Sequence, residues 1–174
     1  MKNKIISTQY IAKIAMLIAI NVVLRQVFLW IPNVQPITAL FLVFTIYSGV
    51  KDTLLIMTLS LFITGMFDGF GLWIGAQILI YAILIICWAF LHKKITNFFM
   101  QLVIVGGLTL FYGFGVSFLT APFFGAKNFW AFYLQGINFD LMHVVATIIS
   151  YPLILEAFKL KPINKFQKIG RGNF

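Results

Sequence analysis

Ser48-Gly49-Val50-Lys51-Asp52 is the stretch that decides the fold, because it separates two apolar segments at 37–49 and 53–66. If these segments formed one long helix, Lys51 and Asp52 would lie near the middle of the bilayer. Each charge there would cost roughly 2.5–3.5 kcal/mol on membrane-insertion scales. The stretch is therefore predicted to be a turn between two helices, each shorter than the ~20 residues that usually cross a bilayer.

The composition of the whole chain is that of a membrane protein. Of its 174 residues, 61% are hydrophobic and only 10% are charged, which is typical of a chain that lies in lipid. We expect one integral membrane domain over residues 1–174 and no soluble domain. The fold class is predicted to be all-α, a six-helix transmembrane bundle whose second and third helices are short. Its spans are expected at approximately 10–31, 37–49, 53–66, 73–91, 98–120 and 129–158, followed by a basic tail at 159–174.

The basic residues between and beyond the apolar segments predict the orientation of the bundle. With six spans, both termini, the Lys51 turn and the His92-Lys93-Lys94 turn lie on one side. Lys and Arg near span ends are retained on the cytoplasmic side. Both termini are therefore predicted to be cytoplasmic, in a multi-pass protein of the cell (inner, or cytoplasmic) membrane. The first apolar segment is too long for a signal peptide, and no small-residue cleavage site follows it.

The sequence contains no signature of several classes of function. The net charge of +9 is spread over separate loops and a tail, which suits anionic lipid headgroups better than nucleic acid. No Gly-rich phosphate loop followed by Lys is present, and no Ser/His or Glu/His catalytic arrangement. His92 and His143 are predicted to lie on opposite sides of the membrane, so they cannot share a metal. The single Cys87 lies in an apolar segment and is interpreted as a buried packing residue. We therefore expect no enzyme, no metal site and no cofactor bound by this chain.

Polar residues gather in the half of the bundle that is predicted to face outward, and in its three outward loops. Ionisable groups within a membrane are rare, and function is the default hypothesis for them. Asp140 and His143 are one turn apart on the sixth segment and so share a helical face. The predicted substrate-binding residues are Arg25, Asn33, Gln35, Asp68, Trp73, Gln77, Phe123, Gln135, Asn138, Asp140 and His143.

A structural role is the alternative for each of these residues. An internal Arg–Asp or His–Asp pair would fix helix packing without a ligand, and single amides would join helices. Asp68 would cap a helix or shape a Gly-rich turn, and Trp73 would belong to an interfacial aromatic belt. Exposed Phe is costly in a loop, so we expect the outward loops to fold inward over a cavity or a ligand. The loop phenylalanines are Phe67, Phe70, Phe123 and Phe124.

Six spans, short second and third helices and ligand chemistry in the outward loops resemble the substrate-binding S component of energy-coupling factor (ECF) transporters, a class of ABC importers for vitamins. Three stretches carry the resemblance. Ala15-Met16-Leu17-Ile18-Ala19 is similar to the family's small-xxx-small motif, and Ala12 extends this small stripe. Pro32-Asn33-Val34-Gln35-Pro36 resembles the first-loop segment of one subgroup. Asn138-Phe139-Asp140-Leu141-Met142-His143 looks like the Phe-Asp-x-x-His stretch that opens the last helix.

The resemblance implies high-affinity capture of a vitamin from outside, under a lid formed by the first and third loops. Ala12, Ala15 and Ala19 would dock on the ECF transmembrane scaffold subunit, and two cytoplasmic ATPase subunits would hydrolyse the ATP. The chain would then topple in the bilayer to expose the ligand inward. Cobalamin is the first candidate ligand, followed by pantothenate, folate, niacin and queuosine-type bases.

Two other functions stay open at this stage. One is a small membrane scaffold or assembly protein without a ligand, whose polar residues join partner helices. The other is a stand-alone channel or proton-coupled carrier that uses Asp140 and His143. Internal inverted repeats are not visible in the sequence, which weighs against a self-sufficient secondary transporter.

Overall fold

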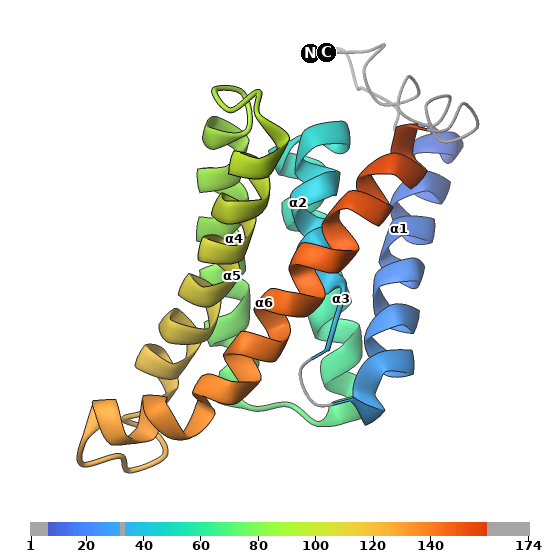
Figure 1. Ribbon diagram of the computed structural model, residues 1–174. Coiled ribbons are helices and arrows are strands. Elements are labelled where there is room, and N and C mark those ends of the chain that lie inside the picture. The colour runs from blue at the N-terminus through green and yellow to red at the C-terminus, as the bar shows by residue number, and fades with distance from the viewer. Residues whose placement is uncertain (1–6, 32–33, 160–174) are drawn as a thin grey trace, which may run out of the picture.

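The computed structural model describes residues 7–31 and 34–159, and these residues form helices joined by short connections (Figure 1). Five of the helices are long and apolar enough to cross a membrane, and one is a shorter apolar helix. The expected all-α class is confirmed for this part of the chain, and its helices suit a multi-pass membrane protein. The predictions on Asn33 and on the tail beyond Lys159 fall outside the described residues. The helices are α1 (Thr8–Val27), the 3-10 helix η1 (Phe28–Trp30), α2 (Ile37–Ser48), α3 (Val50–Asp68), α4 (Leu72–Leu91), α5 (Phe98–Thr120) and α6 (Phe129–Lys159).

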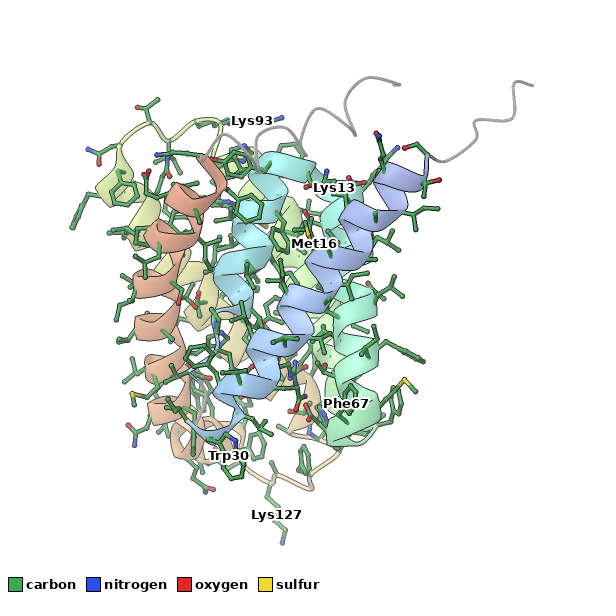
Figure 2. All side chains as sticks on the ribbon, turned by 90° about the vertical axis from the view of Figure 1, so that its right-hand side faces the viewer. Lys13, Met16, Trp30, Phe67, Lys93 and Lys127 are labelled. Atoms are coloured by element: carbon green, nitrogen blue, oxygen red, sulfur yellow. The ribbon has the colours of Figure 1, made fainter. Side chains whose placement is uncertain are left out.

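The connections lie at two opposite ends of the bundle. Those after α1, α3 and α5 share one end, which we call the loop end (Figure 1). The start of α1, the end of α6, the α2–α3 junction and the α4–α5 connection share the other. Figure 2 shows Lys93 near that second end, and Trp30, Phe67 and Lys127 near the loop end. This arrangement is the one that six alternating spans require, and the side of the membrane that each end faces stays a prediction.

The short helix α2 is the centre of the bundle. It packs against each of the five long helices, and every residue from Ile37 to Thr45 is buried. The long helices follow one another around it in the order α1, α3, α4, α5 and α6, and within the described residues α1 and α6 do not contact each other. A helix enclosed by protein does not have to match the bilayer thickness. The 12 residues of α2 therefore suffice, and the predicted short second helix is confirmed.

The third helix is longer than predicted. Instead of 53–66 it covers Val50–Asp68, and its 19 residues are enough to cross a membrane. Gly49 alone separates it from α2, with a φ of 86° that favours glycine. Lys51 and Asp52 consequently belong to the first turn of α3 and not to a loop. The prediction of a short third helix was wrong because it assigned these two charges to the turn.

A charged contact explains how Asp52 is accommodated in a helix. Its carboxylate accepts a hydrogen bond of 2.7 Å from the Tyr10 hydroxyl and lies 3.8 Å from the Lys13 ammonium, both on α1. A negative charge in the first turn is also favourable for the helix dipole. Lys13 is itself buried, so α1 and α3 are joined at this end by a pair that the sequence analysis did not foresee.

Candidate functional site

Four helices bring a hydrogen-bonded polar cluster into the apolar interior. The Thr38 hydroxyl, in the first turn of α2, lies 2.9 Å from the Tyr81 hydroxyl of α4 and 2.9 Å from Nε2 of His143 on α6. The Tyr81 ring stacks on Tyr112 of α5 with the centroids 4.2 Å apart, and Tyr112 meets the His143 ring edge-on at 5.4 Å. All four side chains are buried. We call Thr38, Tyr81, Tyr112 and His143 the buried polar cluster.

The helical repeat explains why these side chains meet. On α6, His143 begins a buried stripe that continues through Ala146, Thr147 and Tyr151, a spacing of three and four residues that keeps one face inward. Thr38 lies on α2, which is enclosed on all sides, so its hydroxyl has to find a partner within the protein. The cluster lies toward the loop end because α2 begins there (Figure 1).

Several buried polar atoms have no hydrogen-bond partner among the described residues. They are Nδ1 of His143, Oε1 of Gln77 on α4, Nδ2 of Asn21 and Nε of Arg25 on α1, Oγ of Ser60 and Oγ1 of Thr147. A buried polar atom without a partner typically costs about 1–3 kcal/mol. Each such atom in a folded protein calls for an explanation, such as an ordered water, an ion or a bound ligand. Gln77 precedes Tyr81 by one helical turn, so the two share a face of α4.

An ion pair joins α1 and α3 at the loop end. Arg25 Nε is 3.6 Å from Oδ2 of Asp68, and Gln26 donates a hydrogen bond of 3.1 Å to the other carboxylate oxygen. The Arg25 side chain is mostly buried, and it lies within electrostatic range of Tyr81 and His143. Arg25 thus has the ionic partner that a structural role requires, while its Nε makes no hydrogen bond among the described residues.

Asp140 lies one turn from His143 but does not pair with it. His143 is hydrogen-bonded to Thr38, and the described residues show no hydrogen bond between His143 and Asp140. The half-buried Asp140 carboxyl group instead packs against Gly113 of α5, where any side chain would collide with it. The internal His–Asp pair that was considered as the structural alternative is therefore not formed by Asp140 and His143; His143 pairs with Thr38 instead.

The other predicted site residues lie farther from the cluster. Gln35 is half-buried in the connection before α2, and Trp73 in the first turn of α4 packs its ring over Gly71. Phe123, Gln135 and Asn138 are exposed.

The loop phenylalanines do not fold inward as predicted. They are exposed at the loop end, where Figure 2 shows Phe67 and Trp30. That prediction was wrong because aromatic rings are stable at a membrane interface, so they need no cavity to cover. The exposed set is Phe67, Phe70, Phe123 and Phe124.

The small residues of α1 lie on its outer face. Ala12, Ala15 and Ala19 are exposed, and so is Met16 between them (Figure 2). The face toward the bundle carries the buried residues of this helix instead, among them Leu17 and Asn21. The alanine stripe is therefore exposed on the surface of the bundle.

Three residues of the cluster, Thr38, Tyr81 and Tyr112, were not predicted from the sequence. Each stands alone in an apolar segment, where Thr and Tyr are ordinary residues. The signal in the sequence is the shortness of the second apolar segment, because a hydroxyl in a helix too short to cross the bilayer needs a partner within the protein. Tyr81 and Tyr112 are the partners that other helices supply.

The described residues contain no group of three His, Cys, Asp or Glu side chains that could hold a metal ion. A comparison of the chain with protein-family models, with curated proteins and with solved structures gave no match.

Proposed function

We propose that this chain is the substrate-binding membrane subunit of an ECF-type ABC importer for a vitamin or related micronutrient. The observation that carries the proposal is the buried polar cluster at the loop end of a six-helix bundle. Ligand pockets in proteins combine mostly apolar walls with a few fixed polar groups. Here three long helices and the central short helix α2 supply that combination, and the unpartnered atoms of Gln77 and His143 add hydrogen-bonding capacity.

The outer face of α1 supports the second half of the proposal, a partner in the membrane. Small residues allow helix backbones to approach closely, and Ala12, Ala15 and Ala19 are exposed on that face. In this proposal they dock on the transmembrane scaffold subunit, and two cytoplasmic ATPases supply the energy. The chain itself binds no cofactor. Cobalamin is the first ligand to test, followed by pantothenate, folate, niacin and queuosine-type bases.

The orientation of the protein yields a direct prediction. In a Cys87→Ala background, a thiol introduced at Lys127 should react with a membrane-impermeant maleimide added outside intact cells, and one at Lys94 should not. The reason is that Lys127 belongs to the loop end, whereas Lys94 belongs to the basic end that is retained in the cytoplasm. If the thiol introduced at Lys94 reacts and the one at Lys127 does not, the orientation is the reverse of the one proposed.

Two polar residues near the cluster are expected to affect ligand binding. Gln77→Ala and Asp140→Asn should weaken binding of the vitamin by about 1–3 kcal/mol each, or roughly five- to 150-fold in Kd. Equilibrium binding to the purified protein in nanodiscs measures this. Asp52→Asn is the control, because its ion pair with Lys13 lies at the opposite end. Normal binding combined with a lowered melting temperature would assign Gln77 and Asp140 to structure alone.

The proposed function is tested by reconstitution with its partners. The protein, the scaffold subunit and the two ATPases are co-expressed, and their complex is purified and placed in liposomes. Uptake of a bound vitamin should require ATP inside and should stop when the catalytic Glu of the ATPases is changed to Gln. Uptake by the isolated chain with a proton gradient would instead establish the stand-alone carrier. Failure to assemble and failure to bind any ligand would favour the scaffold protein.

A further inference from the structure

Among the described residues, three of the six buried polar atoms without a hydrogen-bond partner lie on α1 and α3. They are Nδ2 of Asn21 and Nε of Arg25 on α1, and Oγ of Ser60 on α3. The side chains of Asn21 and Ser60 are deeply buried, because these residues are only 2% and 3% exposed. None of the three belongs to the buried polar cluster, whose residues lie on α2, α4, α5 and α6. The interface between α1 and α3 is therefore a second polar region of the bundle.

Ion pairs at both ends fix the register of α1 against α3. The two helices pack against each other and run in the same direction, toward the loop end (Figure 1). At one end Lys13 is paired with Asp52, and at the other Arg25 is paired with Asp68. The α3 residue stands 39 positions after its α1 partner in the first pair and 43 positions after it in the second.

This register places Asn21 level with Ser60. Offsets of 39 and 43 positions lead from Asn21 to Ser60 and Thr64 on α3. Ser60 and Thr64 are one turn apart and share a face of α3, as Asn21 and Arg25 share a face of α1. Thr64 is also buried, and its hydroxyl donates to the Ser60 carbonyl at 3.0 Å, so its oxygen is still able to accept. We call Asn21, Arg25, Ser60 and Thr64 the α1–α3 seam.

Apolar side chains close the α1–α3 seam toward the basic end. Leu17 is buried one turn before Asn21 on α1, and Ile56 is buried one turn before Ser60 on α3. Polar side chains continue only in the other direction, where Arg25 follows Asn21 by one turn. The seam is therefore a polar region confined by an apolar layer, and it does not form a continuous polar path across the membrane.

Water is the occupant that suits these atoms best. The Asn21 amide nitrogen and Arg25 Nε are donors, whereas the Ser60 hydroxyl both donates and accepts. A buried water typically makes about three hydrogen bonds to polar groups that otherwise lack partners. A small anion suits the seam less well, because the Asp68 carboxylate lies 3.6 Å from Arg25 Nε and would repel it.

We propose that at least one buried water bridges the Asn21 amide and the Ser60 hydroxyl within the α1–α3 seam. The water completes the contact between the two helices midway between their ion pairs. The helix that carries the exposed alanine stripe is thus joined to the bundle by polar bonds on its inner face. The inference does not depend on the proposed importer function, since it requires neither a vitamin nor a scaffold subunit.

Contact between Asn21 and water is measured by NMR on the full chain in nanodiscs, with asparagine labelled by 15N. The Asn21 signal is identified by its loss in Asn21→Leu. The wild type should show magnetisation transfer from water to the Asn21 side-chain amide, although this residue is only 2% exposed. Ser60→Val fills the space of the water and should abolish the transfer. Thr147→Val is the matched control, because it changes a buried unpartnered hydroxyl on α6, which does not contact α1.

Thermal unfolding tests whether Asn21 and Ser60 share one partner. Asn21→Leu and Ser60→Ala should each lower the melting temperature by about 2–4 °C, because each leaves a polar group of the seam with fewer hydrogen bonds. The double variant should lose clearly less than the sum of the two, since both partners of the water are then gone. Asn21→Leu combined with Thr147→Val should instead be additive.

The wild-type spectrum requires no substitution, so a poorly folded Ser60→Val protein leaves the test decisive. The proposal is overturned if the wild type shows no transfer from water to Asn21, or if a folded Ser60→Val protein keeps it. Additive losses in the Asn21→Leu, Ser60→Ala protein would also overturn it. A melting temperature that rises when chloride replaces gluconate at equal ionic strength, and no longer does so in Asn21→Leu, would assign the seam to an anion instead.

Discussion

Replacing Ala15 and Ala19 together by leucine is expected to abolish assembly with the scaffold subunit, and vitamin uptake with it, while ligand binding continues. Both alanines are exposed on the outer face of α1, so leucine there fits without disturbing the bundle. Two leucine side chains would prevent the close backbone approach that small residues permit between membrane helices. Co-purification of the scaffold with tagged wild-type and variant protein measures assembly, and equilibrium binding is measured on the same samples.

Ala131→Leu is the matched control for this experiment. It makes the same substitution at an exposed position near the start of α6, and it should leave both assembly and binding unchanged. Loss of ligand binding in the Ala15→Leu, Ala19→Leu protein, with assembly preserved, would show that the stripe acts inside the subunit. If both assembly and binding are preserved, the scaffold subunit docks on another face of the protein.

Gly113→Ala is expected to destabilise the protein. A Cβ atom at this position would collide with the Asp140 carboxyl group, so this side chain, or α5 against α6, would have to shift. Overpacking of this kind typically costs about 1–3 kcal/mol. The expected result is a lower yield and a clearly lower melting temperature in detergent. Gly107→Ala is the control on the same helix, because a Cβ there meets nothing within 4 Å.

A substitution of Asp140 tests whether the collision with its carboxyl group causes the loss of stability in Gly113→Ala. Asp140→Ala removes the atoms that collide, so the double variant of Gly113→Ala with Asp140→Ala should recover most of the lost stability. Contacting residues are expected to show such non-additivity, whereas distant ones are not. If Gly113→Ala and Gly107→Ala have equal effects, Asp140 does not pack as described.

The fold was largely predictable, because apolar length and segregated charge carry the information about spans. The central position of α2 was not, since it depends on contacts with five other helices, which no local pattern encodes. The length of α3 was missed for a related reason. Lys51 and Asp52 are costly in lipid, but Asp52 is paired with Lys13 and Tyr10 from a helix far away in the sequence.

The candidate site was predictable only in part. His143, Gln77 and Arg25 stand out in the sequence because ionisable groups and amides are rare in membrane spans. Thr38 and Tyr112 do not stand out, since only their neighbours from other helices turn them into parts of a polar cluster. Phe123 was assigned to the site for its cost in water, but at a membrane interface that cost is small.

Equilibrium binding of radiolabelled vitamins to the purified chain in nanodiscs tests the central claim most directly. The panel holds cobalamin, pantothenate, folate, nicotinamide, nicotinate and a queuosine-type base. We predict saturable one-to-one binding of one member, weakened by His143→Ala, which removes a side chain of the buried polar cluster, and unchanged by Asp52→Asn. Binding of none of them, or binding that His143→Ala leaves unchanged, would contradict a substrate-capture subunit built around this cluster.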